Sequence, residues 1–179
     1  AISGMERQLL LARLIRQAPD MAATPAQATR LAAELARLID AAHAERLDFA
    51  RLEGLAPEDY ADHWRLTLDF LKIVTEHWPA ILAARGRLDP AARRNAVLAA
   101  QTAAWERDPP TRPVIAAGST GSLPAAADLM AMVSRLPQGV VVLPGLDPEM
   151  DEVTWEAVKE DDAHPQYGLS RLLARLGAE

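Results

Sequence analysis

Residues 114–143, VIAAGSTGSLPAAADLMAMVSRLPQGVVVL, contain the clearest indication of the fold class of this chain. The two ends of this stretch, Val114–Ala117 and Val140–Leu143, are short apolar runs of the length expected for buried strands. A glycine-rich loop, Gly118–Ser122, and a helical pattern over residues 124–136 lie between them. A strand, a crossover helix and a second strand form a parallel unit. The stretch therefore predicts part of a parallel α/β layer.

Two parallel strands leave backbone groups unpaired at both edges, and continuous apolar strands indicate a sheet that is covered on both faces. We therefore expect further strands outside the 179 residues, in the same polypeptide or in a second copy. The chain opens with AISG and its first methionine is Met5, so we expect either that an initiator methionine was removed or that these residues are the edge of a piece of a longer protein.

The residues before this stretch have a helical pattern. One helix is expected from Ser3 to just before Pro19, and a second from the capping box at Thr24 to about Ala44. A short helical segment near residues 47–52 is expected to follow. Apolar residues at helical spacing predict the core stripes of the two long helices: Met5, Leu9, Leu10 and Leu14 in the first, and Leu31, Leu35, Leu38, Ile39 and Ala42 in the second.

Prolines mark the predicted starts, ends or kinks of the next helices. A helix opening at Pro57 is expected to end or kink at Pro79, with a continuation to Gly86. Asp89 is the predicted N-cap of a helix that runs to about Trp105. Two short helices are expected around residues 152–158 and 169–176. The predicted fold is mostly α with a small α/β part, divided into a helical domain, 1–108, and a partial α/β segment, 109–179.

Composition excludes several classes of function. The 19 basic and 25 acidic residues give a net charge of -6, which argues against tight, nonspecific phosphate binding by the whole chain. The absence of cysteine excludes disulfides, thiolate zinc sites, iron–sulfur ligation and a cysteine nucleophile within these residues. No apolar run approaches the roughly 18 residues of a membrane span. Without a signal peptide pattern, a cytoplasmic location is expected.

The Gly118–Ser122 loop is the first candidate site, because amides between a strand and a helix can hold a phosphate. It lacks the lysine of a P-loop and the Gly-x-Ser-x-Gly order of a nucleophile elbow. The pattern favours a structural turn and leaves a phosphate site open.

No metal site or catalytic residue is predicted. The carboxylates of residues 147–162 lack the spacing of an EF-hand or a restriction-like nuclease, which favours a solvated acidic loop with helix caps. The four histidines, His43, His63, His77 and His164, contain no pair at the i, i+4 spacing of a helical zinc site. Aromatic residues at helical spacing are typical of a core, whereas Arg93, Arg94 and Thr120 are kept as candidates for contact with nucleic acid.

Five blocks carry a family resemblance. They are WRLTLDFLKIVTEHWP (64–79), LDPAARR (88–94), VIAAGSTGSLP (114–124), LPQGVVVLPGLD (136–147) and HPQYGLSRLLARLG (164–177). In this order they resemble AddB, the helicase-nuclease subunit of double-strand break repair, in its proteobacterial form. The resemblance runs over nearly all 179 residues. AddB proteins are much longer, so it implies an internal piece of the amino-terminal, helicase-like half.

The resemblance implies a role in DNA double-strand break repair and recombination, with an AddA-type subunit as partner and DNA bound through the intact protein. It also implies a degenerate superfamily 1 helicase domain of the P-loop NTPase type. An active motor would place magnesium-binding acids after the first strand, where this chain has Ala117, Gly118, Ser119, Thr120, Gly121 and Ser122. We therefore expect a non-catalytic scaffold without a cofactor. The alternatives are a nucleotide- or phosphate-binding enzyme that uses the Gly118–Ser122 loop, and a helical protein-interaction adaptor.

Overall fold

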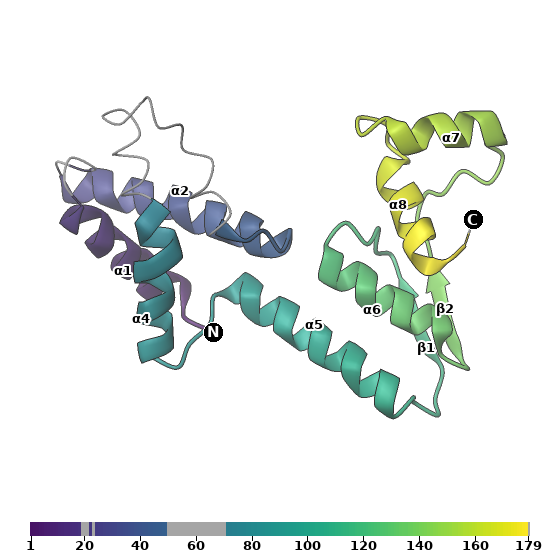
Figure 1. Cartoon of the computed structure of the whole chain (residues 1–179), viewed down its shortest axis with the longest axis horizontal. Coiled ribbons are helices and arrows are strands. Elements are labelled where there is room, and N and C mark those ends of the chain that lie inside the picture. Colours follow the sequence, from purple (N-terminus) through teal and green to yellow (C-terminus); the bar gives the residue numbers. More distant parts are fainter. Residues whose placement is uncertain (19–21, 23, 50–70, 179) are drawn as a thin grey trace. The chain divides into compact units, whose positions relative to one another are not determined.

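The computed structural model describes residues 1–18, 22, 24–49 and 71–178. The chain is mostly helical with a small two-stranded parallel sheet, which confirms the fold class at this level (Figure 1). It divides into two compact units, Ala1–Arg94 and Asn95–Glu179, and helix α5, Pro90–Arg107, belongs to both. The boundary predicted at residue 108 stays a prediction. Every helix among the described residues is too short or too polar to cross a bilayer.

The first two helices begin at the caps expected from the sequence. Helix α1 spans Gly4–Gln17, and the Ser3 hydroxyl accepts a hydrogen bond from the backbone N–H of Glu6. Helix α2 spans Pro25–Ala44, where Thr24 and Gln27 exchange side-chain-to-backbone hydrogen bonds in a capping box. These bonds satisfy N–H groups that have no partner inside a helix.

The buried faces of α1 and α2 match the predicted stripes only in part: Leu35, Ile39 and Ala42 are buried, and Leu10 and Leu14 pack against the core. In α1 the buried residues are Arg7, Leu11, Ala12 and Ile15, whereas Met5 and Leu9 are 75% and 62% exposed. In α2 they are Ala28, Ala32, Leu35, Ile39 and Ala42, whereas Leu31 and Leu38 are 38% and 46% exposed. The exposed predictions in both helices arise because the pattern weighted side-chain size and hydropathy alone. Periodicity counted the largest apolar side chains, but the packed faces contain a buried arginine in α1 and small alanines in α2.

Helix α2 ends in a turn that prevents the helix expected at residues 47–52 from beginning at Leu47. Arg46 has a φ of 55°, and the Leu47 N–H donates to the Ala42 carbonyl at 2.8 Å, as in a Schellman-type helix end. Of the described residues in this range, Leu47 and Asp48 are irregular and Phe49 is in a 3₁₀ turn. The rest of that prediction lies outside the described residues, as does the helix predicted from Pro57 up to Leu71.

A π-helical turn, η2 (Ile73–His77), precedes α4 (Trp78–Ala84). Its widening has a local cause. Pro79 lacks an N–H, and its ring would clash with the carbonyl of Thr75 in a regular α-helix. The Trp78 N–H donates instead to the Ile73 carbonyl, five residues back, so the chain stays helical through the proline. The core of the first unit packs α1 and α2 against these two elements through Leu11, Ile15, Leu35, Ile39, Ile73, Val74, Trp78 and Leu82.

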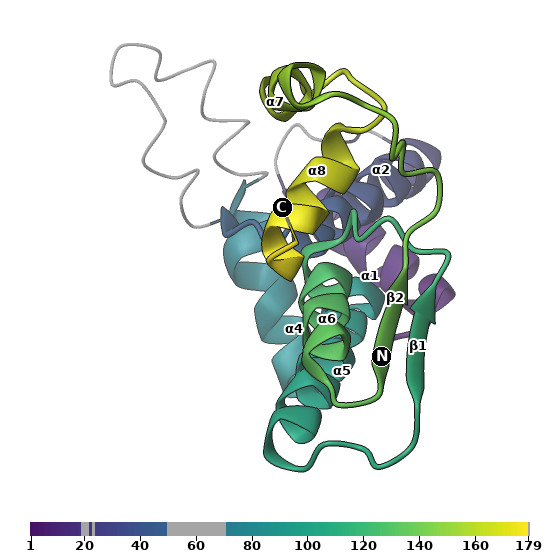
Figure 2. The ribbon, with the colours of Figure 1, turned by 90° about the vertical axis from the view of Figure 1, so that its right-hand side faces the viewer.

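The second unit contains the predicted strand–helix–strand. Strands β1 (Val114–Ala117) and β2 (Gly139–Val142) pair in parallel, with Val114 opposite Gly139 and Ala117 opposite Val142. Helix α6 (Pro124–Arg135) connects them. Figure 2 shows the two strands side by side, with α6 beside them. Helices α7 (Glu152–Glu160) and α8 (Tyr167–Leu176) follow, close to the expected positions.

The sheet is covered on one face. Ala116 and Val141 pack against a small core that contains Met130 of α6 and Leu172 of α8. On the other face Ile115 is 65% exposed, and Val140 and Val142 are about half exposed. The expectation that both faces are covered is therefore wrong for the described residues, because α6 and α8 pack on the same face of the strands.

Candidate functional site

The loop between β1 and α6 is the site that the sequence selected. Gly118 and Gly121 have φ angles of 74° and 62°, a left-handed conformation that glycine adopts without the strain of a Cβ. The Ser119 hydroxyl accepts a hydrogen bond from the Gly121 N–H at 3.2 Å. Ala117, Gly118, Thr120 and Ser122 are exposed, whereas Ser119 and Gly121 are half-buried. The predicted loop residues thus form one compact turn at the carboxyl end of β1.

The helix that follows is poorly equipped to hold a phosphate. Pro124 occupies the first position of α6 and has no N–H to donate. The N–H groups of Ala126 and Ala127 both donate to the Leu123 carbonyl, at 2.9 and 3.0 Å. A phosphate-binding helix directs its first free N–H groups at the ligand. In α6, Pro124 has no N–H and the N–H groups of Ala126 and Ala127 are already bonded, so few N–H groups of the first turn are free to bind a phosphate.

Gly121 has a packing reason to be glycine. A Cβ at this position would lie 2.7 Å and 2.9 Å from the two terminal methyl carbons of Leu172 in α8. A Cβ at Gly118 would meet nothing within 4 Å. The close approach places the loop directly on the buried Leu172 side chain, so the structure favours a structural role for this glycine.

The nearest acid along the chain is already engaged. Asp128 lies in the second turn of α6, and its carboxylate pairs with the guanidinium of Arg175 on α8. This ion pair joins the two helices that cover the sheet. Among the described residues, no cluster of three or more histidine, aspartate or glutamate side chains is placed to hold a metal ion.

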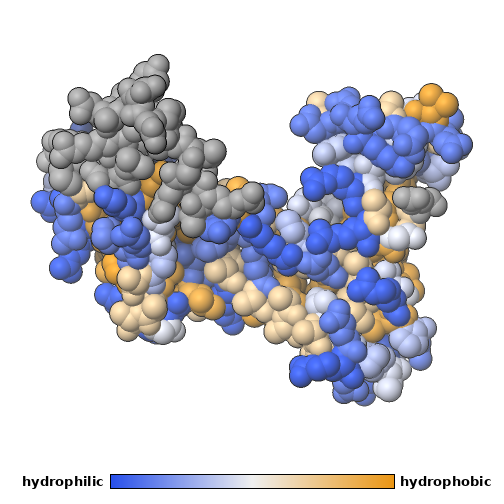
Figure 3. All heavy atoms as spheres, viewed as in Figure 1, coloured by the Kyte–Doolittle hydropathy of each residue, from blue (hydrophilic) through white to orange (hydrophobic). Residues whose placement is uncertain are grey.

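Three carboxylates of the acidic segment 147–162 accept local backbone hydrogen bonds, and one of them caps a helix, as the sequence predicted. Asp151 is the N-cap of α7 and accepts a hydrogen bond from the Thr154 N–H at 2.7 Å, which lowers the pKa of Asp151. Asp147 and Asp161 each accept from a backbone N–H two residues later. Hydrophilic residues dominate the visible surface of α7 (Figure 3).

The candidates for nucleic-acid contact are distributed over both units. Arg93 and Arg94 are exposed in the first two turns of α5, within the first unit. Thr120 is exposed in the loop of the second unit. The structure therefore brings the two arginines together on one helix, but it does not join them to Thr120 within one compact unit.

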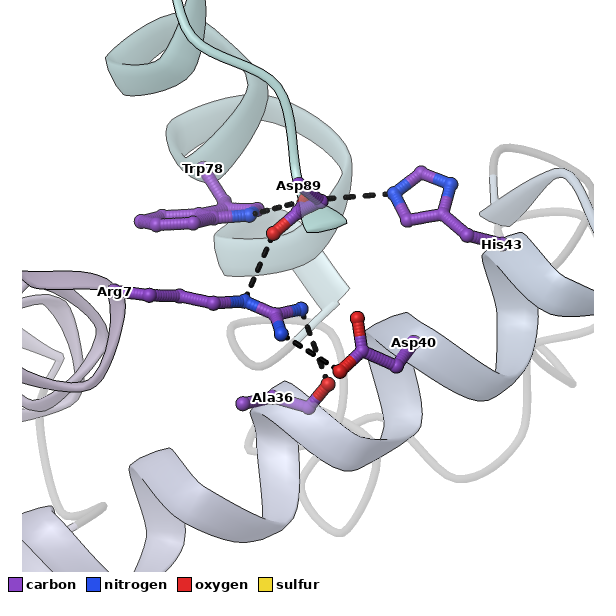
Figure 4. Close-up of polar contacts among 6 residues, drawn as sticks. All are labelled: Arg7, Ala36, Asp40, His43, Trp78 and Asp89. Atoms are coloured by element: carbon purple, nitrogen blue, oxygen red, sulfur yellow. Dashed lines mark hydrogen bonds and ion pairs between the residues drawn. The ribbon is translucent and has the colours of Figure 1, made fainter. Parts of the chain in front are cut away.

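A buried charge network in the first unit was missed by the sequence analysis. Asp89, predicted as a helix cap, is 1% exposed, and its oxygens face other side chains (Figure 4). The Trp78 indole N–H donates to Oδ2 at 2.8 Å, and Nε2 of His43 lies 3.5 Å from the same oxygen. The Arg7 Nε lies 2.8 Å from Oδ1 as an ion pair.

Arg7 connects this network to α2. Its guanidinium, 5% exposed, also donates to Asp40 Oδ2 at 2.8 Å and to the Ala36 carbonyl at 3.1 Å. Burial raises the pKa of Asp89, but hydrogen bonds from His43 and Trp78 and the charge of Arg7 lower it, and the net shift is downward. One local feature of the sequence could have indicated that Arg7 is buried. Arg7 precedes Leu11 by four residues and Ile15 by eight, and this spacing places all three on the same face of α1.

The other histidines agree with isolated roles. His77 is exposed, and Nδ1 of His164 accepts a hydrogen bond from the Gln166 N–H. His63 lies outside the described residues.

Comparisons of the chain with protein families, curated proteins and solved structures found no match.

Proposed function

We propose that the chain is a non-catalytic, helicase-like segment of an AddB-type subunit, which acts as a DNA-handling scaffold in double-strand break repair and recombination. One observation carries the proposal. A parallel strand–helix–strand unit ends its first strand in a turn that has no carboxylate and packs Gly121 on Leu172. A phosphoryl-transfer site needs ligands for magnesium and a group that orients the attacking water. This turn offers neither.

The surroundings of the turn support the same proposal. The first carboxylate of α6, Asp128, is paired with Arg175, and the helix begins with a proline. An enzyme that uses this loop would have to bind nucleotide through hydroxyl groups and the few remaining amides. The scaffold would retain the fold of a helicase motor domain without its ATPase activity, and an AddA-type subunit would supply that activity.

Arg93 and Arg94 are the residues through which this segment would meet DNA. Both are exposed, and neither has an ion pair with a described residue. Two adjacent cations on a helix suit phosphates rather than base edges, because they carry charge without a defined hydrogen-bonding partner. The net charge of -6 makes any such contact local and sensitive to salt.

Nucleotide turnover tests the non-catalytic claim. We expect no magnesium-dependent ATP hydrolysis by the chain, and no heat of specific ATP binding in calorimetry. Hydrolysis that disappears in Thr120→Ala or Ser122→Ala would refute the claim and favour an enzyme that uses the loop. The substitutions are suitable because both side chains are exposed and neither packs in the core.

Binding to single-stranded DNA at several salt concentrations tests the DNA-handling claim. Each phosphate contact to a single strand contributes about 0.7 to the slope of log affinity against log salt. An Arg93→Gln, Arg94→Gln double variant is therefore expected to reduce the slope by about 1.4. Arg13→Gln, Arg16→Gln is the charge-matched control on α1, and its slope should stay unchanged. Negligible affinity at every salt concentration would contradict the claim and favour a protein-interaction adaptor.

A further inference from the structure

A pocket of about 420 Å³ opens in the first unit, next to the Asp89 network. It is formed by the carboxyl-terminal end of α2, the turn after it, η2, α4 and the segment that leads into α5. Pockets of about 300–1,000 Å³ with apolar walls and a few polar groups are typical of small-molecule sites. The pocket therefore has the size of a ligand site and lies in a different unit from the β1–α6 loop.

The walls of the pocket are apolar. Val74, Trp78 and Leu82 line it with side chains that are 2–9% exposed. Leu47 and Leu88 stand at its rim and are 64% and 50% exposed. Covering such side chains removes apolar surface from water, which stabilises a complex in proportion to the area covered. The pocket thus favours an occupant with an apolar body.

The charges around the pocket select the sign of the ligand. Asp89 lines it, but its carboxylate is already paired with Arg7 and hydrogen-bonded to Trp78. His43 and Asp48 also have partners of their own. Arg87 is exposed at the lining, and within the described parts of the chain its guanidinium makes no ion pair or hydrogen bond. Among the described lining residues, the unmatched charge is therefore positive.

We propose that this pocket binds a small hydrophobic monocarboxylate. Its apolar body lies against Val74, Trp78 and Leu82, and its carboxylate pairs with the guanidinium of Arg87. A guanidinium matches a carboxylate with two parallel N–H donors, which a neutral ligand cannot use as well. A cationic ligand would face Arg87, and no free carboxylate among the described lining residues would balance it. The site is independent of the proposed DNA-handling role.

Nuclear magnetic resonance on the full chain tests this site with 1-naphthylacetate and its neutral counterpart, 1-naphthylacetamide. The acid should shift the indole N–H signal of Trp78 and bind about three- to tenfold more tightly than the amide, as expected for one exposed ion pair. Arg87→Gln should remove this preference for the acid. Ala83→Trp, which places a large side chain at the lining, should abolish binding of both compounds.

Matched controls separate the pocket from general effects. Ala80→Trp changes another exposed residue of α4 that does not line the pocket, and Arg93→Gln removes a cation outside it. Both should bind the acid as the unaltered chain does. The proposal is overturned if the acid leaves the Trp78 signal unmoved, if acid and amide bind equally, or if Ala83→Trp binds like Ala80→Trp. The acid–amide comparison uses the unaltered chain, so it remains decisive even if a variant fails to fold.

Discussion

Asp89→Asn is the substitution that most directly tests the organisation of the first unit. It keeps the size of the side chain and an oxygen that can accept from the Trp78 indole, but it removes the negative charge beside Arg7. The Arg7 side chain is 5% exposed and would lose its ion pair with Oδ1 at 2.8 Å. It would keep Asp40 at 2.8 Å and the Ala36 carbonyl at 3.1 Å.

The magnitude follows from these remaining contacts. Removing one partner of a buried ion pair costs about 3–5 kcal/mol, because the other charge stays buried without compensation. The Asp40 contact retains part of that compensation, so the loss should fall near the lower end, about 3 kcal/mol. With urea m-values of about 1–3 kcal/mol/M, this loss lowers the unfolding midpoint by at least about 1 M.

The pH dependence has a defined sign. The pKa of Asp89 in the folded chain lies below its ordinary value, so the stabilisation by its carboxylate is fully present above about pH 4. It is lost as the pH falls through the folded pKa, where the protonated aspartic acid resembles the asparagine. The difference in stability between the unaltered chain and Asp89→Asn should therefore be largest near neutral pH and shrink in acid.

Urea unfolding at pH 7 and at pH 3, followed at the Trp78 indole N–H signal, measures both effects. Asp40→Asn is the matched control, because its carboxylate pairs with the same arginine but its side chain is 42% exposed. It should cost about 1 kcal/mol or less. If Asp89→Asn loses no more stability than Asp40→Asn at pH 7, the reasoning about the buried pair is refuted.

Three glycine substitutions test the packing of the second unit. Gly118→Ala should cost about 1 kcal/mol for its left-handed backbone, and Gly121→Ala should add about 1–3 kcal/mol for the clash with Leu172; equal urea midpoints for the two would contradict this packing. Gly139→Ala places a Cβ 1.8 Å from the Val133 carbonyl oxygen, a backbone atom. This substitution should lower the free energy of unfolding by about 3 kcal/mol or more and accelerate amide hydrogen exchange in β1. Unchanged exchange rates would contradict this prediction and show that the backbone between α6 and β2 can shift to accommodate the Cβ.

Element positions could be predicted from the sequence because their signals are local. The capping box at Thr24, the proline at the start of α6 and the strand–turn–helix pattern before it each depend on a few neighbouring residues. The glycines of the loop could be predicted in the same way. Their assignment to a turn or to a phosphate site could not, because it depends on what lies opposite Gly121, which is a residue 51 positions later, Leu172.

The buried faces were harder to predict. Counting apolar residues placed Met5 and Leu9 in the core of α1, but the helix turns Arg7, Leu11 and Ile15 inward. A hydropathy pattern treats arginine as a surface residue, whereas the burial of Arg7 depends on two carboxylates far away in the sequence, Asp40 and Asp89.

The approximate bounds of most described helices and of both strands, and the parallel direction of the strands, could be read from the amino-acid sequence alone. Those properties follow from capping, proline and short-range periodicity, which act within a few residues. Tertiary contacts were needed to establish which face of each helix is buried, that Asp89 is buried beside Arg7, and that the described helices pack on one face of the sheet. Burial and charge pairing depend on residues far apart in the chain, and their energies exist only once those residues are in contact.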